Sequence, residues 1–183
     1  KQILKEIFGY DSFRKGQEEI VDQILNGRDV LAIMPTGAGK SLCYQVPALL
    51  MSGITIVVSP LISLMIDQVK ALNEAGVHAA YINSALTERQ ITKALELAAA
   101  GRYKMIYVAP ERLLTPRFLD FACHTELSMV TIDEAHCISQ WGQDFRPSYV
   151  GIADFLAQLP KRPVVSAFTA TATERVKQDI MGS

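Results

Sequence analysis

Six short apolar runs, rich in β-branched residues, alternate along this chain with longer stretches of amphipathic helical pattern. The apolar runs predict strands at Val30–Ile33, Ile54–Val58, Ala79–Ile82, Met105–Ala109, Met129–Ile132 and Val164–Phe168. The amphipathic stretches predict helices at Gly16–Leu25, Lys40–Leu50, Leu61–Glu74, Thr87–Ala100 and Tyr149–Leu159. Because the strands are apolar on both sides, both faces of their sheet must be covered. The alternation predicts an α/β fold with a mainly parallel, doubly wound sheet and helices on both faces.

The size and composition of the chain agree with one globular domain. Its 183 residues can bury a substantial core, and no internal repeat, low-complexity tract or linker divides them. We therefore expect residues 1–183 to form a single domain. A hydrophobic content of 49% against 20% charged residues excludes a disordered chain. With a formal net charge of −1, any attraction to nucleic acid must come from a few locally placed Lys and Arg side chains.

An uncharged stretch from Ser41 to Ile66 has the length of a membrane-spanning helix. Pro47, Gly53 and Pro60 would interrupt such a helix, so a buried helix end followed by a buried strand explains the stretch better. We expect no membrane segment, and the N-terminus lacks the apolar run of a signal peptide.

The three cysteines, Cys43, Cys123 and Cys137, lie far apart and form no CxxC pair. This spacing disfavours both a disulfide framework and a zinc site. We expect reduced thiols in a cytosolic protein and no zinc in this part of it.

Polar, Gly-rich or charged segments directly follow five of the six predicted strands. They are Pro35–Ser41, Ser59–Pro60, Pro110–Arg112, Asp133–His136 and Thr169–Thr171. Parallel α/β sheets bind ligands at the carboxyl ends of their strands. The five segments therefore predict one binding site along that edge.

The first of these segments has the pattern of a phosphate-binding loop. Residues Met34–Ser41 read Met-Pro-Thr-Gly-Ala-Gly-Lys-Ser between a strand and a helix, with Met34 where the strict pattern has Gly. Such a loop turns backbone N–H groups toward phosphate oxygens at a helix N-terminus that favours anions. Lys40 is expected to reach the β- and γ-phosphates, and Ser41 to ligate Mg²⁺. The predicted ligands are ATP and Mg²⁺, and the binding residues are Thr36, Gly37, Ala38, Gly39, Lys40 and Ser41.

A pair of carboxylates at the end of another strand completes the expected nucleotide site. Asp133 and Glu134 follow the largely apolar residues Met129–Ile132. Asp133 is expected to hold Mg²⁺, partly through water, and Glu134 to orient or deprotonate the attacking water. An isolated Asp-Glu pair is usually a solvated turn, but a phosphate-binding loop upstream favours hydrolysis. The predicted catalytic residues are Lys40, Asp133 and Glu134.

Four segments of this sequence resemble motifs of superfamily-two helicases. Asp133–His136 is similar to the DEAH signature, and Thr169–Thr171 resembles the Ser/Thr-Ala-Thr element that links the ATP site to nucleic acid. Val58–Leu61 and Ala109–Arg112 resemble the strand-to-loop elements that grip the nucleic-acid backbone. By this resemblance the nucleic-acid and coupling residues include Pro60, Leu61, Arg112, His136, Thr169 and Thr171.

Two further segments narrow the resemblance to the RecQ family. Residues Phe8–Gln17 are similar to its adenine-recognition element, which implies that Tyr10 packs near the base while Arg14 and Gln17 hydrogen-bond around it. Residues His136–Pro147 resemble its aromatic-rich loop. In that loop the resemblance implies that bases stack on Trp141 and Phe145 and that a phosphate pairs with Arg146.

The resemblance covers about Ile7 to Ile180 and implies the N-terminal RecA-like motor domain of a 3′-to-5′ ATP-dependent DNA helicase. The implied partners are single-stranded and partly duplex DNA, and a second RecA-like domain of the full-length protein that carries the arginine finger. We expect that second domain and any C-terminal modules to lie outside these residues. The implied location is the bacterial cytoplasm and nucleoid, or the nucleus of a eukaryote, with the bacterial type favoured.

Three alternatives stay open at this point. A DEAH-type RNA helicase would share the nucleotide motifs, although the segment between Cys137 and Tyr149 argues against it. An ATP-gated DNA-binding module without turnover would describe an isolated motor domain. A small-molecule kinase would leave the Asp133–His136 and Thr169–Thr171 motifs without a task.

Overall fold

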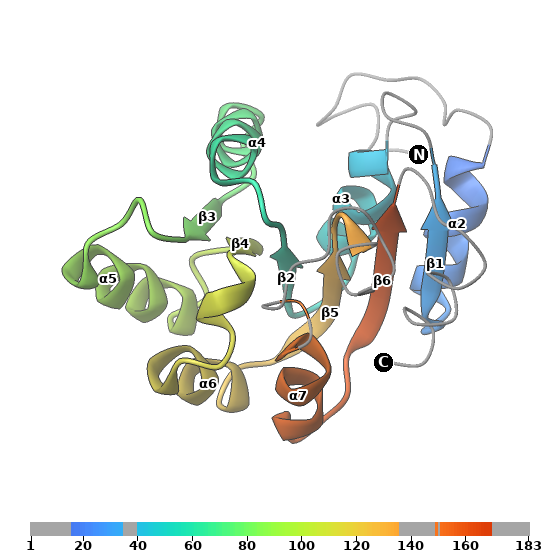
Figure 1. The fold of residues 1–183 in the computed structure, drawn as a ribbon. Helices are drawn as coiled ribbons and strands as arrows, with labels where there is room; N and C mark the ends of the chain where they lie inside the picture. Colours follow the sequence, from blue (N-terminus) through green and yellow to red (C-terminus); the bar gives the residue numbers. More distant parts are fainter. Residues whose placement is uncertain (1–15, 35–39, 136–148, 150, 170–183) are drawn as a thin grey trace.

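The computed structural model describes residues 16–34, 40–135, 149 and 151–169. These residues form a six-stranded sheet whose spatial order is β1-β6-β5-β2-β4-β3 (Figure 1). The strands are β1 (Val30–Ile33), β2 (Ile54–Val58), β3 (Ala79–Ile82), β4 (Met105–Val108), β5 (Leu127–Ile132) and β6 (Val164–Thr169). All of the strand pairings in this sheet are parallel. The predicted fold class is therefore confirmed.

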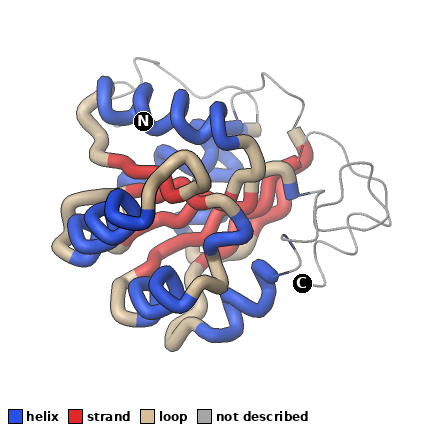
Figure 2. Tube along the Cα trace, turned by 60° about the vertical axis from the view of Figure 1, so that its left-hand side comes forward, coloured by secondary structure: helices blue, strands red, loops and turns tan. Residues whose placement is uncertain are grey.

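Helices cover both faces of the sheet (Figure 2). One face packs against α2 (Gln17–Leu25), α3 (Lys40–Leu50) and α4 (Ile62–Glu74). The other packs against α5 (Glu88–Ala99), α6 (Pro116–Cys123) and α7 (Gly151–Gln158). Each face has its own apolar core, so the sheet lies between two layers of helices, as its parallel pairing requires.

Strand β2 shows why the sequence lacks an alternating pattern. All five of its residues are buried. Ile54, Ile56 and Val58 pack in the core beneath α5, α6 and α7, whereas Val57 packs in the core beneath α3 and α4. Because successive side chains point to opposite faces, a strand covered on both sides is apolar on both, and Thr55 is the one polar residue of β2.

The predicted strands and helices are confirmed with small differences at their ends. The sequence placed Thr169 after the sixth strand, but it is the last residue of β6. The predicted boundary residues Leu61 and Thr87 turn out to be helix caps. Thr87 begins α5 through a capping box, in which its hydroxyl accepts from the Gln90 N–H at 3.2 Å and Gln90 Oε1 accepts from the Thr87 N–H at 2.8 Å.

Two elements were not predicted, the 3₁₀-helix η1 (Pro110–Arg112) and helix α6. Helix α6 has only eight residues, and its first is a proline, which suits the first turn of a helix because its missing N–H would have no partner there. The buried side chains of Phe118 and Phe121, three residues apart, carried the helical spacing that could have revealed it.

Candidate active site

The carboxyl ends of the strands bring the predicted motifs together. The Met34 N–H donates to the Thr169 carbonyl at 2.9 Å, which places the start of the phosphate-binding segment beside the end of β6. The Asp133 N–H donates to the Val58 carbonyl at 2.9 Å, which places the carboxylate pair beside the end of β2. Segments that lie far apart in the sequence therefore meet at one edge of the sheet.

Asp133 is held by its backbone as well as by burial. It follows β5 directly, and only 2% of its surface is exposed. Its Oδ1 accepts from the Glu134 N–H at 3.0 Å, and its carbonyl accepts from the Tyr149 hydroxyl at 2.8 Å. Glu134 has a φ of 53°, a left-handed conformation that costs free energy in a residue with a side chain. This turn holds the Asp133 carboxylate against the Glu134 backbone.

Ser41, in the first turn of α3, is connected to α4 through side chains. The Gln68 Nε2 donates to the Ser41 Oγ at 3.4 Å, and the Tyr44 hydroxyl donates to the Gln68 Oε1 at 2.9 Å. The Tyr107 hydroxyl lies 3.3 Å from that of Tyr44 and accepts from the Gln45 Nε2 at 3.0 Å. Since the Tyr44 proton is used toward Gln68, the Tyr107 hydroxyl is the donor to Tyr44. Each of these hydrogen bonds polarises the next, so the network is cooperative.

The two tyrosines of this network have raised pKa values. Burial raises the pKa of Tyr44 well above its usual range, and the charges of Tyr107 and Asp133 raise that pKa further, while a hydrogen bond with Ser41 acts in the opposite direction. Burial likewise raises the pKa of Tyr107 to about 12, with a smaller contribution from the Asp133 charge. Ser41 and Asp133 therefore both act on the fully buried Tyr44.

The oxygens of Ser41 and Asp133 suit a hard divalent cation. Mg²⁺ is bound by one or two protein oxygens, with substrate phosphates and waters as its other ligands. A serine hydroxyl in the first turn of α3 and a buried carboxylate directly after β5 fit this donor set. Among the described residues, no cluster of three or more His, Cys, Asp or Glu side chains could hold a metal by itself. The donor set fits an ion that arrives with a phosphate ligand.

Several other predicted residues lie in the described part of the chain. Gln17, at the start of α2, is 1% exposed, so its amide lies inside the protein. Leu61, before α4, is 42% exposed, and Thr169 is fully buried. Arg112, at the end of η1, forms an ion pair with Glu88 at 3.5 Å.

The remaining predicted residues lie outside the described part. Nothing is described for Tyr10, Arg14, Thr36, Gly37, Ala38, Gly39, His136, Trp141, Phe145, Arg146, Thr171 and the side chain of Lys40. The backbone of Lys40 forms the first residue of α3.

Sequence reasoning missed the residues that position the predicted ones. Gln68, Tyr44 and Tyr149 belong to no motif that was considered for function. Gln68 lies on α4 between the buried residues Met65 and Val69, but Asp67 and Lys70 are also polar, so no local pattern distinguished it. The role of the Tyr149 hydroxyl depends on a contact across 16 residues, which no local pattern reveals.

A cavity of about 460 Å³ lies away from these residues. Leu25 and Leu50, the last residues of α2 and α3, and Leu127 and Val164, the first residues of β5 and β6, line it. These positions mark the amino ends of the strands, opposite to Asp133.

None of the described helices is long and apolar enough to span a membrane.

The family to which these motifs belong follows from comparison with known proteins. Residues 14–180 match the family model described as DEAD/DEAH box helicase. The chain belongs to this family. It is 48% identical over 179 residues to the ATP-dependent DNA helicase RecQ of Haemophilus influenzae, which covers 98% of this chain and 29% of that protein. It is 51% identical over 181 residues to the RecQ of Bacillus subtilis, and the match covers 98% of this chain and 31% of that protein. The predicted resemblance to RecQ is confirmed, and this DEAD/DEAH box domain spans less than a third of these relatives.

Solved structures show the same fold at lower sequence identity. A hypothetical ATP-dependent RNA helicase from Sulfolobus tokodaii has a TM-score of 0.75 and 22% identity, over 99% of this chain and 53% of that one. The Mycobacterium smegmatis helicase Lhr, bound to ssDNA and AMP-PNP, also has a TM-score of 0.75, at 17% identity over 97% of this chain and 26% of that one. The chain has the RecA-like helicase fold.

Proposed function

We propose that this chain is the ATP-binding and ATP-hydrolysing motor domain of a 3′-to-5′ DNA helicase of RecQ type. It would couple ATP hydrolysis to translocation on single-stranded DNA and to duplex unwinding in recombination and repair, within the bacterial nucleoid or a nucleus. The observation that carries this proposal is the meeting of the motifs at the carboxyl edge of the sheet, where Met34 lies beside Thr169 and Asp133 lies beside Val58. The names of the relatives support DNA as the substrate.

In the proposed nucleotide site, residues 36–41 bind the phosphates and Lys40 neutralises the charge that develops on the γ-phosphate. Ser41 and Asp133 would hold Mg²⁺, which supplies charge neutralisation at the phosphates. Glu134 orients the attacking water and accepts its proton. The hydrogen bond from the Glu134 N–H to Asp133 Oδ1 supports the metal-binding role of Asp133, because a fixed carboxylate needs little reorganisation during the reaction.

A separate set of residues is proposed to recognise the adenine base. Tyr10 would stack beside the base, and Arg14 and Gln17 would bind its edge. Gln17 is the first residue of α2, and its amide can both donate to and accept from the edge of a base.

The proposed path for single-stranded DNA crosses the loops at the same edge. Pro60, Leu61 and Arg112 would contact the backbone, while Trp141 and Phe145 would stack on bases. The residues proposed to connect this path to the nucleotide are His136, Arg146, Thr169 and Thr171. A second RecA-like domain would supply the arginine finger.

The proposal is tested on the full-length protein with ATP hydrolysis and strand-separation assays. We expect single-stranded DNA to stimulate ATP hydrolysis, and duplexes with a 3′ single-stranded tail to be unwound in preference to those with a 5′ tail. Stimulation by RNA rather than DNA would favour an RNA helicase. Nucleotide-dependent DNA binding without turnover would favour an ATP-gated binding module.

A further inference from the structure

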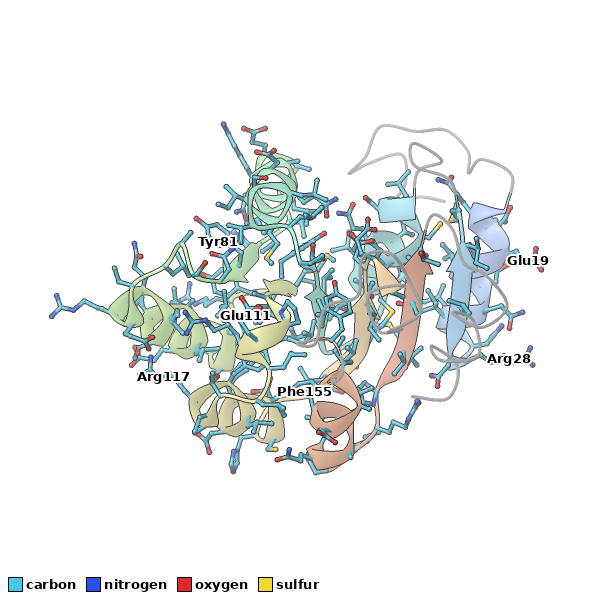
Figure 3. All side chains as sticks on the ribbon, viewed as in Figure 1. Glu19, Arg28, Tyr81, Glu111, Arg117 and Phe155 are labelled. Atoms are coloured by element: carbon cyan, nitrogen blue, oxygen red, sulfur yellow. The ribbon has the colours of Figure 1, made fainter. Side chains whose placement is uncertain are left out.

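Two arginines contact one carboxylate beyond the carboxyl ends of β3 and β4. Arg112 Nη1 lies 3.5 Å from Glu88 Oε1, and Arg117 Nη1 lies 3.2 Å from Glu88 Oε2. Figure 3 shows Arg117 between α5 and α6. The three residues come from three elements: Glu88 from the start of α5, Arg112 from η1 and Arg117 from the first turn of α6.

The topology places this cluster on the edge where the nucleotide motifs lie. Helix α5 follows β3, and η1 follows β4, so both begin at the carboxyl ends of their strands. A hollow of about 410 Å³ opens there, lined by Glu88, Arg112, Thr115 and Arg117 among others. The cluster therefore faces a space that an external group can enter.

Arg117 is positioned independently of the Glu88 carboxylate. Its Nη1 also donates to the backbone carbonyl of Glu88 at 3.1 Å and to the Thr92 Oγ1 at 2.7 Å. A guanidinium carries five N–H donors, of which Nη1 holds two, so these contacts do not exhaust it. The guanidinium would stay in place if the carboxylate left.

The carboxylate itself is free to leave. The Glu88 side chain is 70% exposed, and those of Arg112 and Arg117 are 25% and 47% exposed. Exposed ion pairs contribute little stability because water solvates both partners. Two forked guanidinium groups on one side of a hollow match the oxygen geometry of a phosphate as well as that of a carboxylate.

We propose that Arg112 and Arg117 form a clamp for one backbone phosphate of single-stranded DNA, and that Glu88 occupies this clamp when DNA is absent. Glu88 is then an internal competitor that weakens DNA binding. Arg117, which no motif assigned to DNA, becomes a contact residue equal to Arg112. This inference rests on the proposed function, because it presumes that DNA follows this edge of the sheet.

The test measures binding of a fluorescently labelled oligothymidylate to the full-length protein across a range of salt concentrations. Glu88→Gln should tighten binding by up to about fivefold at low salt, the range that an exposed ion pair allows. Glu96→Gln is the matched control, because it removes the same charge from an exposed position on the same helix. It should change binding little.

Arg117→Gln is the second variant to be tested in this binding measurement. It should weaken binding and reduce the slope of log Kd against log salt by about one, the loss of one phosphate contact. In the Arg117→Gln background, Glu88→Gln should give a smaller gain. Circular dichroism and thermal unfolding of each variant check that it folds.

The clamp is overturned if Glu88→Gln and Glu96→Gln change the Kd for DNA equally. It is also overturned if Arg117→Gln leaves the slope of log Kd against log salt unchanged. The helicase proposal would stand in either case. Failure of the unsubstituted protein to bind the oligonucleotide at all would instead overturn the proposed function. The two failures are therefore distinguishable.

Discussion

At the scale of single residues, ATP turnover is expected to depend most strongly on Lys40. Substituting Lys40→Ala should abolish detectable ATP turnover and strongly weaken ATP binding, because the charge facing the β- and γ-phosphates is lost. The backbone of α3 should be unaffected, since Ala is a good helix former. Nucleotide binding by calorimetry checks the prediction, with circular dichroism as the control for folding. A folded variant with normal affinity and turnover would contradict it.

Gln17 is expected to read the base rather than the phosphates. In its proposed role Gln17 binds the edge of the base, so Gln17→Ala should leave a group of the bound base unpaired at a cost of about 1–3 kcal/mol. The measurement is the ratio of ATP to GTP affinity, which should fall. An equal loss of affinity for both nucleotides would show that Gln17 supports the fold and does not read adenine.

At the scale of elements, the side-chain network from Gln45 to Ser41 joins α3, β4 and α4. Gln68 donates to the Ser41 oxygen and so orients the other lone pair of that oxygen. Gln68→Leu should therefore raise the Mg²⁺ concentration needed for nucleotide binding by about fivefold, the equivalent of one hydrogen bond. A titration of fluorescent ATP analogue binding against Mg²⁺ measures this change.

Gln45→Leu is the control for that prediction. It breaks the far end of the network at Tyr107 and leaves the contact between Gln68 and Ser41 in place. It should lower stability without changing the Mg²⁺ requirement. If both variants shift the Mg²⁺ titration equally, the network acts through general stability, and Gln68 does not position the hydroxyl.

The same network predicts a loss of stability in alkali. Tyr107 has a pKa near 10 when unfolded and about 12 in the folded protein, because burial disfavours the phenolate. Because the pKa is higher in the folded protein, the contribution of Tyr107 to the free energy of unfolding is fully present below pH 10 and is lost as the pH rises toward 12. The free energy of unfolding should fall across this window less steeply in Tyr107→Phe. Parallel pH profiles for the two proteins would refute the assignment.

At the scale of the whole molecule, we expect residues 1–183 to form one RecA-like domain, which provides one wall of the proposed active site. Expressed alone, this domain should bind Mg·ATP weakly, hydrolyse it slowly at best and unwind no duplex. An arginine finger from a facing domain contributes about 10³–10⁵ in rate. Adding a second RecA-like domain should restore DNA-stimulated turnover. Unwinding by residues 1–183 alone would contradict this account.

The elements themselves could be predicted from the sequence because their signals are local. Strands such as Ala79–Ile82 follow from continuous apolar runs, and α3 follows from a strand–turn–helix pattern at the phosphate-binding segment. Helix α6 was missed because eight residues beginning with proline give too short a periodic pattern. Local patterns also identified Ser41 and Asp133 as candidates, since each stands directly after a strand or loop of recognisable type.

The sequence by itself therefore determined the fold class, the nucleotide motifs and the family. Only the tertiary structure decided which strands are neighbours, in the order β1-β6-β5-β2-β4-β3. That order brings Met34 to Thr169 and Asp133 to Val58, and it allows Tyr149 to hold the Asp133 carbonyl. An apolar pattern specifies that a surface is buried, but it does not specify the surface that buries it. For the same reason, the pairing of Arg112 and Arg117 with Glu88 appears only once the chain is folded.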